Sequence, residues 1–378
     1  MNRSLRLPLT VFILSSFSTA YAVLPYDQGG SEVFVTGTGS ASYNDNVFLV
    51  NTKEKGSFIF DEIPGLEVDY NTNADTKGIL TSKEDFVQYA NISHQNTELN
   101  HTDFNGNYSD DKLLLDLDAG FNQFAQNTRE TVGVTQAGVI VRNDVTNVTP
   151  QSEWTLSEKT TLGLGFNYND NHYKTAGFQS LTVYEVPMNV YYEVAPKLSV
   201  SAGYRYRYSQ IKGNDSTDNY VNVGARGEFT AKLHGTVNVG YLERSFSASS
   251  SGSNQSELGL ESTLAYDYSE KTAFRLGASN DFTNAATGNT EKVLSFTGGA
   301  TSKLSEQFTA DLAISYSETH YAGIQRTDDY VETTPTISYL YNKYVTVSAS
   351  YTYRNNASTL AGVKFDNNVA TASVTVRF

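Results

Sequence analysis

Residues 160–173 read TTLGLGFNYNDNHY, and apolar side chains occupy alternate positions along most of this stretch. Leu162, Leu164, Phe166 and Tyr168 share one face of an extended chain, whereas glycine and asparagine share the other. A period of two is the pattern of a β-strand whose two faces meet different surroundings. The same alternation recurs at residues 198–209 and 370–378, so the chain is predicted to be all-β.

The connections between these segments alternate in length. From residue 160 onward, tight charged turns such as 195–197, 269–271 and 341–343 take turns with longer polar loops at 212–218, 247–256, 283–290, 320–327 and 355–361. This order predicts antiparallel hairpins standing side by side, with the turns at one end and the loops at the other. We place eighteen strands, near 33–43, 57–69, 84–94, 111–124, 131–142, 145–157, 160–173, 181–194, 198–211, 219–231, 234–247, 257–268, 272–283, 292–302, 307–320, 328–341, 344–355 and 366–378. Residues 77–92 and 95–111 are irregular, which keeps sixteen strands as an alternative.

The composition of the two faces decides the fold class. The polar face is rich in glycine, serine, threonine and asparagine with charged residues inserted, which is too small and too charged for a packed core. A tilted strand crosses the hydrocarbon layer in about 9–11 residues, and only helices or closed barrels satisfy their backbone there. The pattern predicts a transmembrane outer-membrane β-barrel of about eighteen antiparallel strands. Tyrosines near strand ends on the apolar face fit an interface girdle; they are Tyr206, Tyr208, Tyr241, Tyr266, Tyr268, Tyr316, Tyr339, Tyr341, Tyr351 and Tyr353.

Both ends of the chain carry export signals. Two arginines, an apolar stretch at 7–17 and the small residues Ala20 and Ala22 predict a signal peptide over residues 1–22. A short periplasmic segment at 23–32 and a barrel at 33–378 would follow, in the outer membrane of a Gram-negative cell. Val374, Val376 and Phe378 share one face of the last strand. This ending resembles the C-terminal signal of bacterial outer-membrane proteins, which implies the barrel-assembly machinery as a partner.

Composition excludes several classes of protein. The chain has 41 acidic and 27 basic residues, a formal charge of -14 and a pI near 4.8, which argues against binding nucleic acid. The absence of cysteine excludes disulfides, a thiol nucleophile and a lipoprotein anchor. No glycine motif for nucleotides is present, and no cofactor is predicted. The expected surroundings are outer-membrane lipid and lipopolysaccharide.

A short motif near the start of the predicted barrel suggests a family. Tyr43-Asn44-Asp45-Asn46-Val47-Phe48 is followed by Phe58-Ile59 and by Ile63-Pro64-Gly65-Leu66. This combination resembles the putative beta-barrel porin-2 family. The resemblance implies an outer-membrane barrel with a role in polysaccharide export or surface assembly, since family members often accompany exopolysaccharide or capsule gene clusters. A polysaccharide or a periplasmic export protein is therefore an expected partner.

Charged residues on the polar face are the candidate site. They are Arg205, Arg207, Arg226, Arg244, Arg275, Glu185, Glu257 and Glu261, and Asp116 and Asp118 share their inward direction on an earlier strand. We hypothesise that the arginines steer an anionic solute or sugar through the lumen. The plainer interpretation is a solvated interior wall, in which each ion pair contributes only about 0–1 kcal/mol.

Catalysis and metal binding have weaker support. His172 and His320 lie at predicted outer strand ends near aspartates, but nothing fixes a nucleophile beside them, so no enzyme is predicted. Asp215 with Asp218, or Asp328 with Asp329, could bind cations that bridge lipopolysaccharide, although acidic loops usually only solubilise, and no metal site is predicted. Three functions stay open: a channel for polar solute such as polysaccharide, an occluded structural or surface-interaction barrel, and an outer-rim hydrolase.

Overall fold

The computed structural model describes residues 31–71, 75–131, 138–247 and 254–378. The predicted signal peptide, with Ala20 and Ala22, lies outside the described residues. So does most of the predicted periplasmic segment at 23–32, and the described chain enters its first strand at Glu32. The division of the first 32 residues therefore stays a prediction.

The described residues form nineteen strand segments and two single-turn 3-10 helices. The strands are β1 (Glu32–Asn44), β2 (Ser57–Asn71), β3 (Thr76–Tyr89), β4 (Thr97–Ser109), β5 (Leu113–Ala125), β6 (Arg142–Ser157), β7 (Thr160–Gly165), β8 (Asn167–Tyr173), β9 (Leu181–Ala195), β10 (Leu198–Ile211), β11 (Ser216–Glu228), β12 (Leu233–Phe246), β13 (Gln255–Asp267), β14 (Thr272–Asn284), β15 (Thr290–Lys303), β16 (Phe308–Tyr321), β17 (Arg326–Asn342), β18 (Val345–Ser358) and β19 (Phe365–Arg377). The 3-10 turns are η1 (Ser93–Gln95) and η2 (Ala361–Val363). Neither is long enough to cross a bilayer, and no other helix in the described ranges does so.

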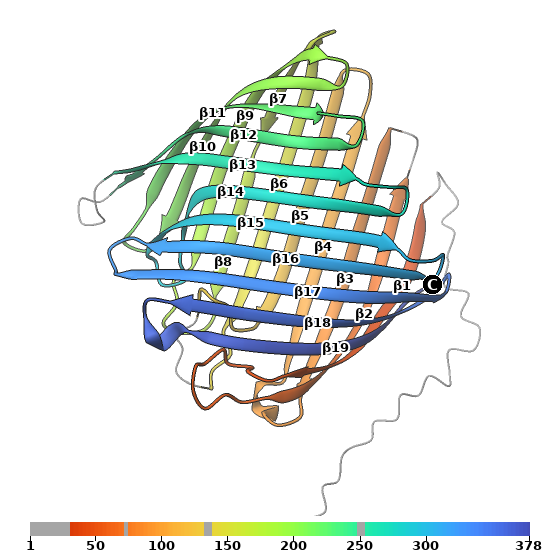
Figure 1. The fold of residues 1–378 in the computed structure, drawn as a ribbon, viewed down its shortest axis with the longest axis vertical. Coiled ribbons are helices and arrows are strands. Elements are labelled where there is room, and N and C mark those ends of the chain that lie inside the picture. Colours follow the sequence, from red (N-terminus) through yellow and green to blue (C-terminus); the bar gives the residue numbers. More distant parts are fainter. Residues whose placement is uncertain (1–30, 72–74, 132–137, 248–253) are drawn as a thin grey trace, which may run out of the picture.

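The sheet is closed. Neighbouring strands pair antiparallel along the chain, and β1 pairs with both β2 and β19. β7 and β8 are two parts of one crossing interrupted at Phe166, because both pair with β6 on one side and β9 on the other. The barrel therefore has eighteen crossings, which confirms the predicted fold class. In Figure 1 the front strands β11 to β19 run across the steeper back strands β2 to β6, as tilted strands of a closed barrel do.

The strand count is right, but two of the predicted strands in the first third are wrong. The segment predicted at 84–94 is β3, which begins at Thr76, and β4 was not predicted at all. The segment predicted at 131–142 is no strand where it is described, since residues 138–141 form a loop before β6, and 132–137 lie outside the described residues. Glu84 and Glu98 interrupt the apolar rows of β3 and β4, whereas Ile140 belongs to a buried apolar loop.

The barrel is hollow. On β5, Leu115 is 39% exposed on the outer face, and Asp118, which points the other way, is exposed as well. A sandwich would bury one of these two faces. The inward direction is set by contacts between strands that are not neighbours, such as the ion pair of Arg226 on β11 with Glu153 on β6.

Tyrosine hydroxyls near the loop end of the outer face bind polar groups close to the loops. Tyr208 donates to Asp215 over 3.1 Å, Tyr316 to Asp329 over 2.9 Å and Tyr353 to Asp366 over 3.1 Å. We call these three tyrosines and their carboxylate partners the tyrosine collar. A ring that rests on apolar surface while its hydroxyl reaches polar groups is the expected state of an interface tyrosine.

The sequence motif at 43–48 lies at the loop end of the β1–β19 ladder that closes the barrel. Asp45 accepts hydrogen bonds from the backbone and side-chain nitrogens of Asn368 on β19, over 2.8 and 2.6 Å. Asn46 is fully buried and donates to the carbonyls of Val50 and Asp366, over 2.7 and 2.9 Å, while it accepts from the Val50 N–H. These bonds fasten the loop after β1 to the last strand.

Candidate functional site: the lumen and its infolded elements

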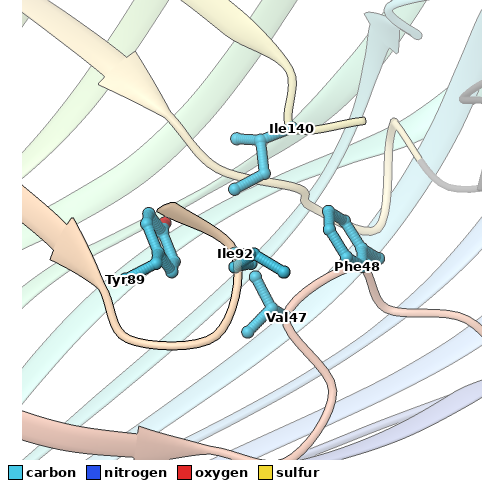
Figure 2. Packing of buried hydrophobic residues seen from close by; sticks show 5 residues of the cluster. All are labelled: Val47, Phe48, Tyr89, Ile92 and Ile140. Atoms are coloured by element: carbon cyan, nitrogen blue, oxygen red, sulfur yellow. The ribbon is translucent and has the colours of Figure 1, made fainter. Parts of the chain in front are cut away.

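Three connections from the long-loop end pack together, as Figure 2 shows. The cluster consists of Val47 and Phe48 after β1, Tyr89 and Ile92 at the end of β3, and Ile140 before β6. Ile59 and Val87, on β2 and β3, pack against it. Because Val87 shares the inward phase of β3, the cluster holds these loops against the inner wall.

The loop after β5 reaches across the lumen. Its Arg129 donates to the hydroxyl of Ser317 on β16, and its guanidinium lies 5.6 Å from the ring centre of Tyr330 on β17. β16 and β17 lie far from β5 in the strand order of the closed sheet, so the contact spans the interior. Beside it, burial raises the pKa of the Glu130 carboxyl.

A second element folds inward from the opposite side. Residues 281–291, at the loop end of β14 and β15, form what we call the infolded hairpin. Its tip residues Ala285 and Ala286 are buried. The Gln179 N–H donates to the Ala286 carbonyl over 2.9 Å, and the Asn214 side chain donates to the Gly288 carbonyl over 2.8 Å. The tip therefore rests on the loops that follow β8 and β10.

Arg244, which is fully buried, and Arg207, which is 12% exposed, hold the base of the infolded hairpin. Arg244 donates two bonds to Asp218, over 2.6 and 2.8 Å, and one to the Thr283 carbonyl over 2.8 Å. Arg207 donates to Asp218 over 2.7 Å and to Asp281 over 2.8 Å. Arg244 and Asp218 are 0% and 1% exposed. We call Arg207, Arg244, Asp218 and Asp281 the arginine clamp.

Arg205 extends the clamp along β10. It donates to Asp281 over 2.8 Å and to Glu261 on β13, and its Nε lies 3.5 Å from Glu185 on β9. Its guanidinium also lies 4.9 Å from the ring centre of Tyr220. Three guanidinium groups thus meet four carboxylates on the inner wall, so the arginines are neutralised locally.

The remaining predicted site residues lie apart from this cluster. Arg226 pairs with Glu153 over 2.9 Å and stacks on Tyr191, with 3.3 Å to the ring centre. Glu257 pairs with Lys292 over 2.6 Å. Arg275 shares the inward phase of Asp281 on β14, is exposed, and forms no ion pair within the described part of the chain. The role of these residues in selectivity stays a prediction.

The sequence reasoning missed the carboxylates that organise the site. The sequence predicts a loop at Asp218, which instead belongs to β11, and the predicted site does not include Asp281. The alternation of β14 contains a signal for the inward direction of Asp281, because Asp281 is in phase with Arg275. No local pattern reveals that Arg129 bridges the lumen, since its partners are contributed by β16 and β17.

The two rim histidines have ordinary hydrogen-bond partners. His172 Nδ1 lies 3.2 Å from the Ser180 hydroxyl, which also accepts a bond from the Tyr173 N–H. His320 lies 2.8 Å from Glu318 through Nε2 and 3.1 Å from Thr327 through Nδ1. Within the described residues His172 has no carboxylate partner of the kind that orients a catalytic histidine.

The chain is similar to several solved structures at low sequence identity. No curated protein sequence matches the chain. The Pseudomonas aeruginosa protein OccK2 (OpdF), solved in complex with glucuronate, is similar in structure, with 10% identity, a TM-score of 0.49 and coverage of 92% of this chain and 98% of its own. Pseudomonas aeruginosa OpdL has 12% identity, a TM-score of 0.49 and coverages of 92% and 99%. Acinetobacter baumannii OccAB4 has 12% identity, a TM-score of 0.48 and coverages of 94% and 100%.

A family model matches the C-terminal part of the sequence. The match covers residues 212–378 and is to Putative beta-barrel porin 2. This region contains β11 to β19, the infolded hairpin, and Asp218 and Arg244 of the clamp. Taken with the closed antiparallel sheet, the match makes the chain a porin-like β-barrel of the Gram-negative outer membrane.

Proposed function

We propose that the barrel conducts polar solutes through a lumen narrowed by the loop after β5 and by the infolded hairpin. One observation carries the proposal: inward side chains such as Arg275 and Asp118 are exposed, so the interior holds solvent. Barrels of 16–18 strands leave an aqueous channel. The polysaccharide suggested by the family resemblance is the proposed solute, and the protein acts without catalysis.

The rival function is an occluded barrel that serves a structural or surface-binding role. The bridge from Arg129 to Ser317 favours this candidate, because it spans the lumen. Conductance in planar bilayers separates the two functions. A conducting pore supports the channel, and soluble polysaccharide fragments should then interrupt the current. A barrel that migrates as folded before heating, yet never conducts, would establish the occluded form.

Arg275→Ala is expected to lower the anion preference of the pore. Among the predicted inward arginines, Arg275 is the one that forms no ion pair in the described structure. Its charge is therefore available to a solute. The measurement is the reversal potential under a KCl gradient. Thr297→Ala is the matched control, because Thr297 is an exposed, uncharged inward residue on the neighbouring strand. An unchanged reversal potential in Arg275→Ala would remove the steering role.

A further inference from the structure

The infolded hairpin leaves the barrel wall on its β14 side only, because β15 stays paired with β16 up to Glu291 opposite Tyr321. The β13–β14 ladder runs from the pair Asp267–Ala273 to the pair Leu260–Asn280 and stops there. β14 continues to Asn284, paired with β15, and residues 255–259 of β13 stay paired with β12. Over that length the wall has no backbone ladder between β13 and β14.

The Phe282 side chain lies on the inner side of the wall, although its position in the alternation of β14 corresponds to the outer face. It is in phase with Phe274 and Leu276, which are exposed on the outer face. Phe282 is nevertheless only 2% exposed and packs with Tyr220 and Leu242 of the inner wall. The chain therefore turns inward between Asn280 and Phe282. This is the point at which β14 separates from β13, as a hinge would require.

The unused edge of β13 matches the hairpin in register. Continued as it stands, the ladder would place Asp281 opposite Gly259 and Phe282 opposite Leu258. Leu258 is 66% exposed on the outer face, and Phe282 would join it there. Asp281 would keep its inward direction. The sequence is thus compatible with a regular wall as well as with the infolded arrangement.

In the observed arrangement of the described residues, only side chains connect residues 255–259 of β13 to the residues on either side of the infolded hairpin. The Asn280 side chain donates to the Leu258 carbonyl over 2.6 Å, and Lys292 pairs with Glu257 over 2.6 Å. The arginine clamp and the contacts of the tip hold the hairpin from within. Movement onto β13 would exchange these contacts for ladder hydrogen bonds, without breaking the β14–β15 pairing.

We propose that the infolded hairpin is a gate with two positions, one docked on the inner wall of β10 to β12 and one zipped onto β13. In the docked position it narrows the lumen, and in the zipped position it completes the wall and widens the lumen. The hinge lies at Asn280 and Asp281, and the arginine clamp is the latch. This inference rests on the proposed channel function.

Disulfide trapping tests the two positions, and the natural chain has no cysteine to interfere. Gln179→Cys with Ala286→Cys traps the docked position, because these residues already share a 2.9 Å backbone hydrogen bond. Leu258→Cys with Phe282→Cys traps the zipped position, and Ser256→Cys with Asn284→Cys does so while keeping Phe282. The control pair is Ser338→Cys with Ser348→Cys, which are directly opposite in the β17–β18 ladder.

The expected result is that all four pairs cross-link in membranes. The zipped traps should conduct at least twice as much as the docked trap, and reduction should remove the difference. Absence of cross-linking in both zipped pairs, with the control pair linked, would overturn the gate, as would equal conductance of docked and zipped forms. Cross-linking of every pair in a barrel that never conducts would support the two positions and overturn the channel function instead.

Discussion

Arg244→Met is expected to lower the free energy of unfolding by about 3 kcal/mol, the lower end of the cost of breaking a buried ion pair. The guanidinium is fully buried and bonds to Asp218 and to the Thr283 carbonyl. Removing it leaves a buried carboxylate with one partner fewer. The loss stays at the lower end because Arg207 still donates to Asp218.

Urea unfolding in lipid vesicles measures this effect, with the single tryptophan, Trp154, as the fluorescent reporter. The matched control is Lys197→Met, which breaks the ion pair with Glu228 at the turn end of the barrel. The Lys197 side chain is 71% exposed, so its loss should change stability by less than about 1 kcal/mol. Equal losses in the two variants would show that the clamp adds nothing beyond a surface ion pair.

Asn46→Ala is expected to destabilise the closed barrel by about 2–3 kcal/mol, because it leaves the Val50 N–H and the Asp366 carbonyl without their partner. Asn46 is fully buried where the loop after β1 meets β19. Water cannot replace the lost bonds without opening that junction. The variant should therefore also lose its compact, heat-modifiable form at a lower temperature.

Two companion variants make the measurement specific. Asn51→Ala removes one exposed hydrogen bond in the same loop, to the Ala361 carbonyl, and should cost about 1 kcal/mol or less. Asn46→Asp keeps an acceptor for the Val50 N–H but places a buried carboxylate oxygen against the Val50 and Asp366 carbonyls, so it should cost at least as much as Asn46→Ala. If Asn46→Ala and Asn51→Ala unfold at the same temperature, the motif at 43–48 has no special role in closing the barrel.

The sequence predicted the barrel well because a lipid-facing wall imposes a period of two on each crossing. The alternation in β10 correctly set the inward direction of Arg205 and Arg207. Prediction failed where the environment changes along a strand. Glu84 and Glu98 lie on the outer faces of β3 and β4 and hide their pattern, and Ile140 is apolar because it packs inside the lumen.

The candidate site was less predictable, because its geometry depends on where a ladder ends. β14 keeps its alternation through Phe282, yet Phe282 is turned to the inner wall. The cause is the contact of the base of the hairpin with Arg207 and Arg244 on strands distant in sequence. Local periodicity describes which way a side chain points within a strand, but not whether that strand stays in the wall.

The tyrosine collar has a consequence for the membrane itself. Each hydroxyl is bonded to a carboxylate near a loop, so each ring is held near the loop end of its strand on the outer face. Interface anchors held in this way cannot shift to match a thicker or thinner bilayer. The lipid must therefore change its thickness to relieve the hydrophobic mismatch. The protein should impose its own hydrocarbon thickness on the surrounding leaflet, and its neighbours in the membrane would be selected by that thickness.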